Sequence, residues 1–230
     1  MMDSKYSNNF KILDRVDAAN KLLSILPLEL MQDEKWQLIA ISSGSVAIVD
    51  IIASKISLSY DLLFTKEILA PNNKECTIAI VSEAQEIVMN KKLADSFAIS
   101  EDYIFGEAKR RYEKDIINYI YQYRKGEHIS SLENKMILLV DQGCESGMTM
   151  LCAIKSALKL KAKKVSIALP VMPKNIYKGL EAMVDKIYVN HKIEDFIDID
   201  YYYKDLNDLS SKEVQDIIKN SKYYLPYNKT

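Results

Sequence analysis

Short apolar runs alternate along the chain with segments whose apolar positions repeat every three or four residues. The runs favour β-strands and cover residues 36–42, 60–65, 76–82, 136–141, 164–171 and 186–190. Most of these runs are apolar on both faces, which is typical of strands in a parallel sheet that helices cover on both sides.

Two of the intervening segments carry a continuous apolar stripe at helical spacing. The stripe residues are Val46, Val49, Ile52 and Ile56 in segment 45–57, and Leu151, Ile154, Ala157 and Leu158 in segment 149–161. Because strands and helices alternate, the pattern predicts right-handed crossovers and an α/β fold with a parallel doubly wound sheet.

Two further helices are expected outside this alternation. One is an N-terminal amphipathic helix over residues 14–26, and the other is a long charged helix over residues 100–126. Ser100 is a typical helix start and Gly126 a typical helix stop. Arg110 and Arg111 lie on the long helix, which either presents a solvated face, covers a site or forms a dimer contact.

Composition narrows the class of protein. The chain has 230 residues, 48% of them hydrophobic, and a formal net charge of −1, so we expect one packed domain over residues 1–230. Nothing in the overall charge favours nucleic acid or an anionic membrane, and no apolar stretch is long enough to span a bilayer. The polar N-terminus has no apolar signal core, and Cys76, Cys144 and Cys152 show neither metal-ligand nor disulfide spacing, so a reduced cytoplasm fits best.

The segment ILLVDQGCESGMT, residues 137–149, is the chemically most informative part of the sequence. It should lie at the carboxyl end of a strand and before a helix, where backbone N–H groups and the helix dipole favour an anion. Gly143 and Gly147 allow close approach, and Ser146 and Thr149 add hydroxyl donors. The alternative is a strand–turn–helix capped by Ser146 without a ligand. Cys144 has no visible general base beside it, which argues against a nucleophile.

The same segment resembles the phosphoribosyl pyrophosphate (PRPP) motif of type I phosphoribosyltransferases. FKILDRVDAANKLL, LAPNNKECTIAIVSE, YRKG, ALPVMPK and DLSSKEVQDII are similar, in order and spacing, to a bacterial subgroup of that family. The resemblance implies a parallel sheet that carries the phosphate loop. It also implies a small hood over the site from residues 1–30 and 190–230.

The resemblance assigns roles to the phosphate loop. Asp141 and Gln142 stand at the two positions that bind the ribose hydroxyls, although Gln142 replaces the second acid of the family. The 5′-phosphate would be held by Cys144, Glu145, Ser146, Gly147, Met148 and Thr149. Glu145 stands where the purine-salvage branch has an acid, so it is the candidate general acid/base, with a solvated loop glutamate as the alternative.

On the pyrophosphate side the sequence departs further from the family. The candidate residues there are Ser42, Ser43, Gly44, Ser45 and Lys66. Ser43 stands where the subgroup has an arginine. Glu67 reverses the charge of the next family position after Lys66. These changes should weaken the electrostatic hold on pyrophosphate, unless the residues are ordinary surface serines and a solvated Lys–Glu pair.

The implied activity is transfer of a phosphoribosyl group from PRPP to a nitrogenous base, a purine or a related base, with release of pyrophosphate. Mg²⁺ would be carried by PRPP, and the family is commonly dimeric. The rival hypothesis is a non-catalytic sensor of PRPP or a nucleoside 5′-monophosphate. Phosphatase-like or phosphoribosyl-hydrolysing activity ranks third. Tyr201, Tyr202 and Tyr203 would either stack on a base or pack against the core.

Overall fold

A five-stranded parallel sheet forms the centre of the protein. In the computed structural model, which describes residues 11–227, the strand order is β2(Tyr60–Leu62), β1(Gln37–Ala40), β6(Met136–Val140), β7(Lys164–Pro173) and β8(Lys186–Ile193). Every neighbouring pair in this sheet is parallel. The predicted parallel α/β sheet is thereby confirmed. The polar N-terminal segment and the first ten residues of the expected hood lie outside the described residues.

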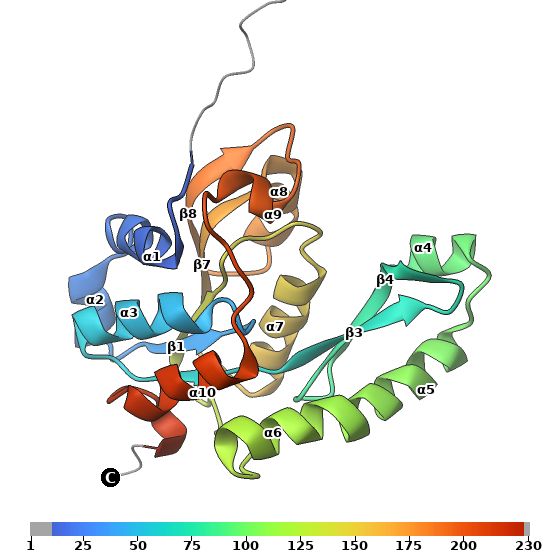
Figure 1. The fold of residues 1–230 in the computed structure, drawn as a ribbon, viewed down its shortest axis with the longest axis horizontal. Coiled ribbons are helices and arrows are strands. Elements are labelled where there is room, and N and C mark those ends of the chain that lie inside the picture. The colour runs from blue at the N-terminus through green and yellow to red at the C-terminus, as the bar shows by residue number, and fades with distance from the viewer. Residues whose placement is uncertain (1–10, 228–230) are drawn as a thin grey trace, which may run out of the picture.

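Helices cover both faces of this sheet (Figure 1). The α-helices of the described residues are α1(Arg15–Leu23), α2(Leu28–Asp33), α3(Val46–Ile56), α4(Lys91–Ser96), α5(Glu101–Arg111), α6(Ile117–Arg124), α7(Met148–Lys159), α8(Lys174–Glu181), α9(Ile199–Tyr202) and α10(Ser211–Asn220). Alternate strand residues point to opposite faces. Leu38 therefore packs in the core with α1, α3 and α10, and its neighbour Ile39 packs in the core with α7 and α8.

The predicted stripes of α3 and α7 differ in outcome. All four stripe residues of α3 are buried, as expected. In α7, Ile154 and Ala157 are buried, but Leu158 is 51% exposed and the prediction for it is wrong. The physical reason is that α7 has two buried sides: Ala153 faces the parallel sheet and Cys152 faces a second sheet, which leaves Leu158 on the remaining, solvated side.

The second sheet is antiparallel and has the order β3(Thr65–Ala70), β4(Asn73–Ser82) and β5(Ile87–Met89). The predicted run 76–82 is therefore a strand, but it lies outside the parallel sheet. A tight turn separates it from β3, and two strands joined so closely must pair antiparallel. Its run is apolar on both faces because α7 covers one face and the long helix lies along the other.

The long helix runs beside this hairpin as one side of an arm that projects from the sheet (Figure 1). It consists of α5, a π-helical turn over Tyr112–Ile116 and α6. The predicted start is confirmed, because the Ser100 hydroxyl accepts the Tyr103 amide at 3.2 Å. The predicted stop is also confirmed: Lys125 and Gly126 follow with φ of 56° and 92°. Between residues 11 and 227, helices that are both long and apolar enough to cross a bilayer are absent.

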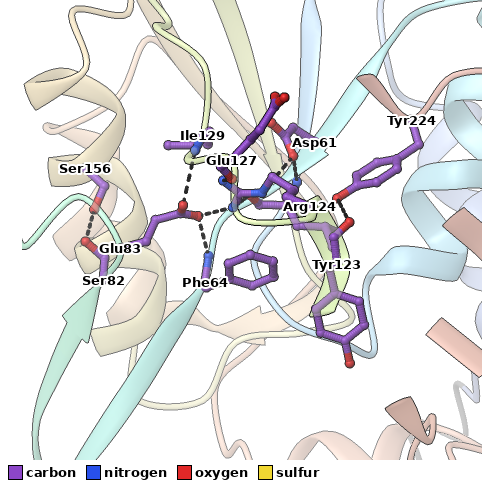
Figure 2. Close-up of polar contacts among 11 residues, drawn as sticks. Asp61, Phe64, Ser82, Glu83, Tyr123, Arg124, Glu127, Ile129, Ser156 and Tyr224 are labelled. Carbon is purple, nitrogen blue, oxygen red and sulfur yellow. Dashed lines mark hydrogen bonds and ion pairs between the residues drawn. The ribbon is translucent and has the colours of Figure 1, made fainter. Parts of the chain in front are cut away.

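A buried ion network fixes the base of this arm (Figure 2). The guanidinium of Arg124, on α6, lies 3.5 Å from the Asp61 carboxylate, pairs with the Glu83 carboxylate and donates to the Leu62 carbonyl at 2.9 Å. Glu83 also accepts the Phe64 amide at 2.9 Å. The network thus ties the end of the long helix to β2 and to the end of β4, beside the edge of the sheet where the candidate site lies.

Candidate functional site

The loop between β6 and α7 encloses a small cavity of about 150 Å³ at the carboxyl edge of the sheet. The sequence-predicted residues that line it are Asp141, Gly143, Cys144, Glu145, Ser146, Gly147 and Thr149. A water molecule occupies about 30 Å³ in the liquid, so the cavity has room for a group larger than one water. The residues of the predicted phosphate loop thus surround one cavity.

Two glycines shape this loop. Gly147 has a φ of +77°, and a Cβ there would lie 2.8 Å from Cγ2 of Ile176. A Cβ on Gly143 would lie 2.9 Å from Cγ1 of Ile199. Both positions therefore need glycine, the first for its backbone conformation and its close packing, the second because the C-terminal segment packs directly on the loop.

The loop amides differ in their freedom to bind an anion. The Cys144 amide donates to the Val171 carbonyl at 3.2 Å, and the Met148 amide donates to the Ser146 hydroxyl at 3.4 Å. The amides of Glu145 and Ser146, by contrast, take part in none of the hydrogen bonds found within residues 11–227. These two amides, with the Ser146 and Thr149 hydroxyls, are the donors that an anion in the cavity could use. Burial raises the pKa of the Cys144 thiol to about 12, so it stays a neutral thiol at neutral pH.

Asp141 connects this loop to the loop after β1. Its Oδ1 atom accepts the Ser42 hydroxyl at 2.5 Å and the Gln142 amide at 2.8 Å. Burial raises the pKa of Asp141 to about 6, although these two hydrogen bonds favour the carboxylate. Asp141 is therefore an acceptor at the cavity wall, held in place by Ser42.

Arg15, which the sequence reasoning did not identify, joins three segments beside this site. Its Nε donates to the Gly44 carbonyl at 2.9 Å, its Nη2 to Gln142 Oε1 at 3.2 Å, and its Nη1 to the Asn207 carbonyl at 2.8 Å. All three acceptors are neutral, so none of these three hydrogen bonds pairs the guanidinium with a carboxylate. The one signal in the sequence was the presence of Arg15 in a segment that resembles the phosphoribosyltransferase subgroup.

The Gln142 side chain contacts Gly44 in the loop after β1, and it does not line the small cavity. A Cβ on Gly44 would lie only 2.1 Å from Gln142 Oε1, so the glycine is needed for this contact. The Gln142 carbonyl accepts the Tyr203 hydroxyl at 2.7 Å. Tyr202 and Tyr203 are buried, which supports packing against the core over stacking on a ligand, and Tyr201 is exposed.

Glu145 is engaged with the C-terminal segment. Its Oε1 atom accepts the Ile199 amide at 3.0 Å, at the first residue of α9. The carboxylate thus closes the segment over the loop, and it also lines the small cavity. In this arrangement Glu145 has a positioning contact, and its other oxygen remains for a ligand.

A larger cavity of about 400 Å³ lies beside the residues that were predicted for the pyrophosphate side. Ser42, Ser43 and Lys66 line it, as the resemblance implies, and Lys66 Nζ lies 5.0 Å from the ring centroid of Tyr119. Glu67 and Thr149 line both cavities, so the two are adjacent. Gly44, Ser45 and Met148 line neither: the buried Ser45 hydroxyl donates to the Ser42 carbonyl at 2.8 Å and braces the loop.

Comparison with known proteins places the fold. No family model matches the chain. TT1426 from Thermus thermophilus aligns over 90% of this chain and 97% of its own, with 21% identity and a TM-score of 0.70. A hypoxanthine phosphoribosyltransferase from Staphylococcus aureus aligns over 85% and 84%, with 19% identity and a TM-score of 0.46.

A hypoxanthine-guanine phosphoribosyltransferase from Bacillus anthracis aligns over 85% of this chain and 94% of its own, with 14% identity and a TM-score of 0.46. The match to TT1426 covers nearly the whole of both chains, so the two share one fold. In this chain that fold is a mostly parallel central sheet with flanking helices and a small antiparallel sheet, as the sequence resemblance implied. The chain therefore shares the α/β fold of TT1426, and its architecture is the one implied by the resemblance to type I phosphoribosyltransferases.

Proposed function

We propose that the chain binds PRPP and transfers its phosphoribosyl group to a nitrogenous base, a purine or a related base, with release of pyrophosphate. The observation that carries the proposal is the junction of the two cavities. The small cavity offers the amides of Glu145 and Ser146 for a phosphate, and the larger one begins at Thr149 and extends to Lys66. A ligand with phosphates at both ends fits this pair of cavities.

The carboxylates around the small cavity fit a Mg²⁺ ion that arrives with PRPP. Asp141, Glu67 and Glu145 line this cavity, but they do not form a ready-made cluster of three ligating side chains, and the rest of residues 11–227 contains none either. Mg²⁺ usually takes one or two carboxylates together with waters and substrate phosphates. PRPP would carry the ion, Glu67 would be its ligand from the protein, and the ion would neutralise charge on the diphosphate when bound.

The residues of the chain would act mainly by positioning and charge stabilisation. Asp141 would accept hydrogen bonds from the ribose hydroxyls, with its carboxylate fixed by Ser42 at 2.5 Å. The loop amides would hold the 5′-phosphate, and Lys66 would stabilise the charge that develops on the departing pyrophosphate. Glu145 would hold or move a proton at the base nitrogen with the oxygen that Ile199 does not occupy.

A non-catalytic sensor of PRPP or a nucleoside 5′-monophosphate is the second candidate. The observation in its favour is the contact between Glu145 and the Ile199 amide, because a carboxylate that closes the hood need not transfer protons. Gln142 also faces Arg15, so of the two predicted ribose-binding residues Asp141 alone lines the small cavity. A sensor would bind these ligands without turnover.

One experiment separates these candidates. Calorimetric titration with Mg²⁺–PRPP and with AMP, GMP, IMP and UMP measures binding, and a panel of bases with PRPP then measures nucleotide formation. Binding that is lost in Ser146→Ala/Thr149→Ala, together with nucleotide formation, supports the transferase. Binding without turnover across the whole panel contradicts the transferase and supports the sensor. No binding of any of these ligands contradicts both.

The proposal extends to assembly and location. We expect a homodimer and a cytoplasmic protein that takes small-molecule ligands. Sedimentation at micromolar concentration measures the first expectation.

A further inference from the structure

The long helix forms one wall of the larger cavity, and the function proposed above gives that wall no role. Its residues at the wall are Arg111, Tyr119 and Tyr123, and Ser42 and Ser43 on the loop after β1 line the same cavity. Arg111 is the last residue of α5 and directly precedes the π-helical turn over Tyr112–Ile116. π-Helical turns are frequent at functional sites, so the turn is consistent with a functional role for this part of the long helix.

The guanidinium of Arg111 is only partly satisfied. Its Nη1 atom lies 3.0 Å from Oδ2 of Asp115, in a half-buried ion pair. Its Nε atom is buried, and within the described part of the chain it has no hydrogen-bond partner. A buried donor without an acceptor costs free energy of folding, and an anion in the adjacent cavity would supply the missing acceptor.

The surroundings favour an anion there. Lys66 lines the same cavity and takes part in none of the ion pairs found among residues 11–227. The start of α3 also lines the cavity, at Val46. This 11-residue helix has an N-cap, Ser45, that makes no side-chain capping bond, and its dipole adds positive potential there. Of the described lining residues, Glu67 is the single carboxylate against two cations.

We propose that Arg111 is an anion-binding residue for the diphosphate of PRPP, or for free pyrophosphate, in the larger cavity. This inference rests on the proposed function, because it assigns a further residue to the pyrophosphate side of that site. In the free protein Asp115 holds the guanidinium at the cavity wall. The diphosphate then takes its remaining donors, and Arg111 on the long helix supplies the cation that Ser43 does not provide.

The test compares two neighbouring arginines. Arg110 is exposed and is held by Glu107 through two hydrogen bonds on the solvent side, so Arg110→Gln is the matched control for Arg111→Gln. Calorimetry measures binding of Mg²⁺–pyrophosphate and, separately, of ribose 5-phosphate. We expect Arg111→Gln to weaken pyrophosphate binding about tenfold or more, as loss of a charged hydrogen bond does, and to leave ribose 5-phosphate binding unchanged.

Asp115→Asn tests the same idea from the other side. It removes the partner that competes with the ligand for Arg111, so pyrophosphate should bind severalfold more tightly. This variant keeps the inference testable if Arg111→Gln fails to fold, which circular dichroism would reveal.

Three results overturn the inference. One is equal pyrophosphate affinity in Arg111→Gln and the wild type, and another is an equal loss in Arg110→Gln. The third is weaker pyrophosphate binding in Asp115→Asn. If ribose 5-phosphate binds but pyrophosphate does not, the role of Arg111 is refuted while the phosphate loop stands. If neither binds, the proposed function fails with it.

Discussion

The guanidinium Nη2 of Arg15 lies 3.2 Å from the side-chain oxygen of Gln142, a residue 127 positions further along the chain. The same guanidinium holds the Gly44 carbonyl, so one side chain of α1 fixes both loops of the candidate site relative to each other. By the sequence resemblance, Gln142 stands where the type I phosphoribosyltransferase motif has its second acid. The amide therefore meets an arginine and does not cancel its charge.

Replacing Arg15 should weaken binding more than it affects folding. In Arg15→Ala the loop after β1 loses its brace, and the site loses a nearby positive charge. We expect affinity for PRPP to fall about tenfold, the usual scale for a lost hydrogen bond of a charged group. Arg15→Lys should recover part of this loss, since it keeps the charge but not the three-way geometry.

Calorimetry with Mg²⁺–PRPP measures the effect, and Lys55→Ala on the exposed side of α3 is the control. Unfolding in urea monitors stability in parallel. An Arg15→Ala protein that binds PRPP like the wild type would show that the brace is dispensable.

Two substitutions at Glu145 separate closure of the hood from proton transfer. Glu145→Gln keeps an oxygen that can accept the Ile199 amide, whereas Glu145→Ala removes it. If the carboxylate transfers a proton, Glu145→Gln should lower kcat about a hundredfold or more with little change in ligand affinity. If the contact only closes the hood, Glu145→Gln should behave as the wild type and Glu145→Ala should bind more weakly. Steady-state kinetics and calorimetry together distinguish these outcomes.

Gly147→Ala should be destabilising and should reduce phosphate binding. The left-handed backbone costs a non-glycine residue roughly 1–2 kcal/mol, and the new methyl group would also press against Ile176. Gly179→Ala is the matched control, because its position on α8 is open and helical, and alanine there should be neutral or stabilise by up to about 1 kcal/mol. Urea unfolding of both variants measures the difference, and equal stability would contradict the strain argument.

The buried carboxyl of Asp61 should make stability depend on pH. Burial raises its pKa from 3.8 to about 6, even though Arg124 opposes the shift. Since the folded pKa lies above the unfolded one, the contribution of Asp61 is fully present below about pH 3.8 and is lost as pH rises to about 6. The advantage of the wild type over Asp61→Asn should therefore shrink by roughly 3 kcal/mol across this window.

Urea unfolding at several pH values between 4.5 and 7.5 measures the part of this change that is accessible to a folded protein. Asp208→Asn, at an exposed position, is the control for an Asp-to-Asn substitution outside the core. A difference between the wild type and Asp61→Asn that stays constant with pH would mean that Asp61 titrates alike in the folded and unfolded chain.

Much of the fold follows from local pattern. The runs that became β1 and β6 are apolar on both faces because helices cover both sides of the sheet, and the cap at Ser100 is a local interaction. The sequence TKEILA of β3 gave no comparable signal, since Lys66 and Glu67 interrupt it. Without β3 in view, nothing indicated that residues 76–82 would pair antiparallel in a second sheet.

The candidate site likewise has a part that the sequence predicts and a part that it does not. The proximity of Ser42 and Asp141 follows from their places at the ends of two strands that pair in parallel, and strand–helix periodicity predicts both strands. The contacts of Arg15 and Arg111 depend on how helices pack against loops far away in the sequence. Such contacts leave no periodic trace, so the structure was needed to find them.

Glu67 and Thr149, which line both cavities, have a consequence for selectivity. A molecule with a single phosphate can place an anionic group in one cavity only, and the part that extends beyond it meets the Glu67 carboxylate. A molecule with anionic groups at its two ends must span that point, where a bound divalent cation would offset the repulsion. The site would thus select ligands by the distance between their two charged ends, independently of which base they carry.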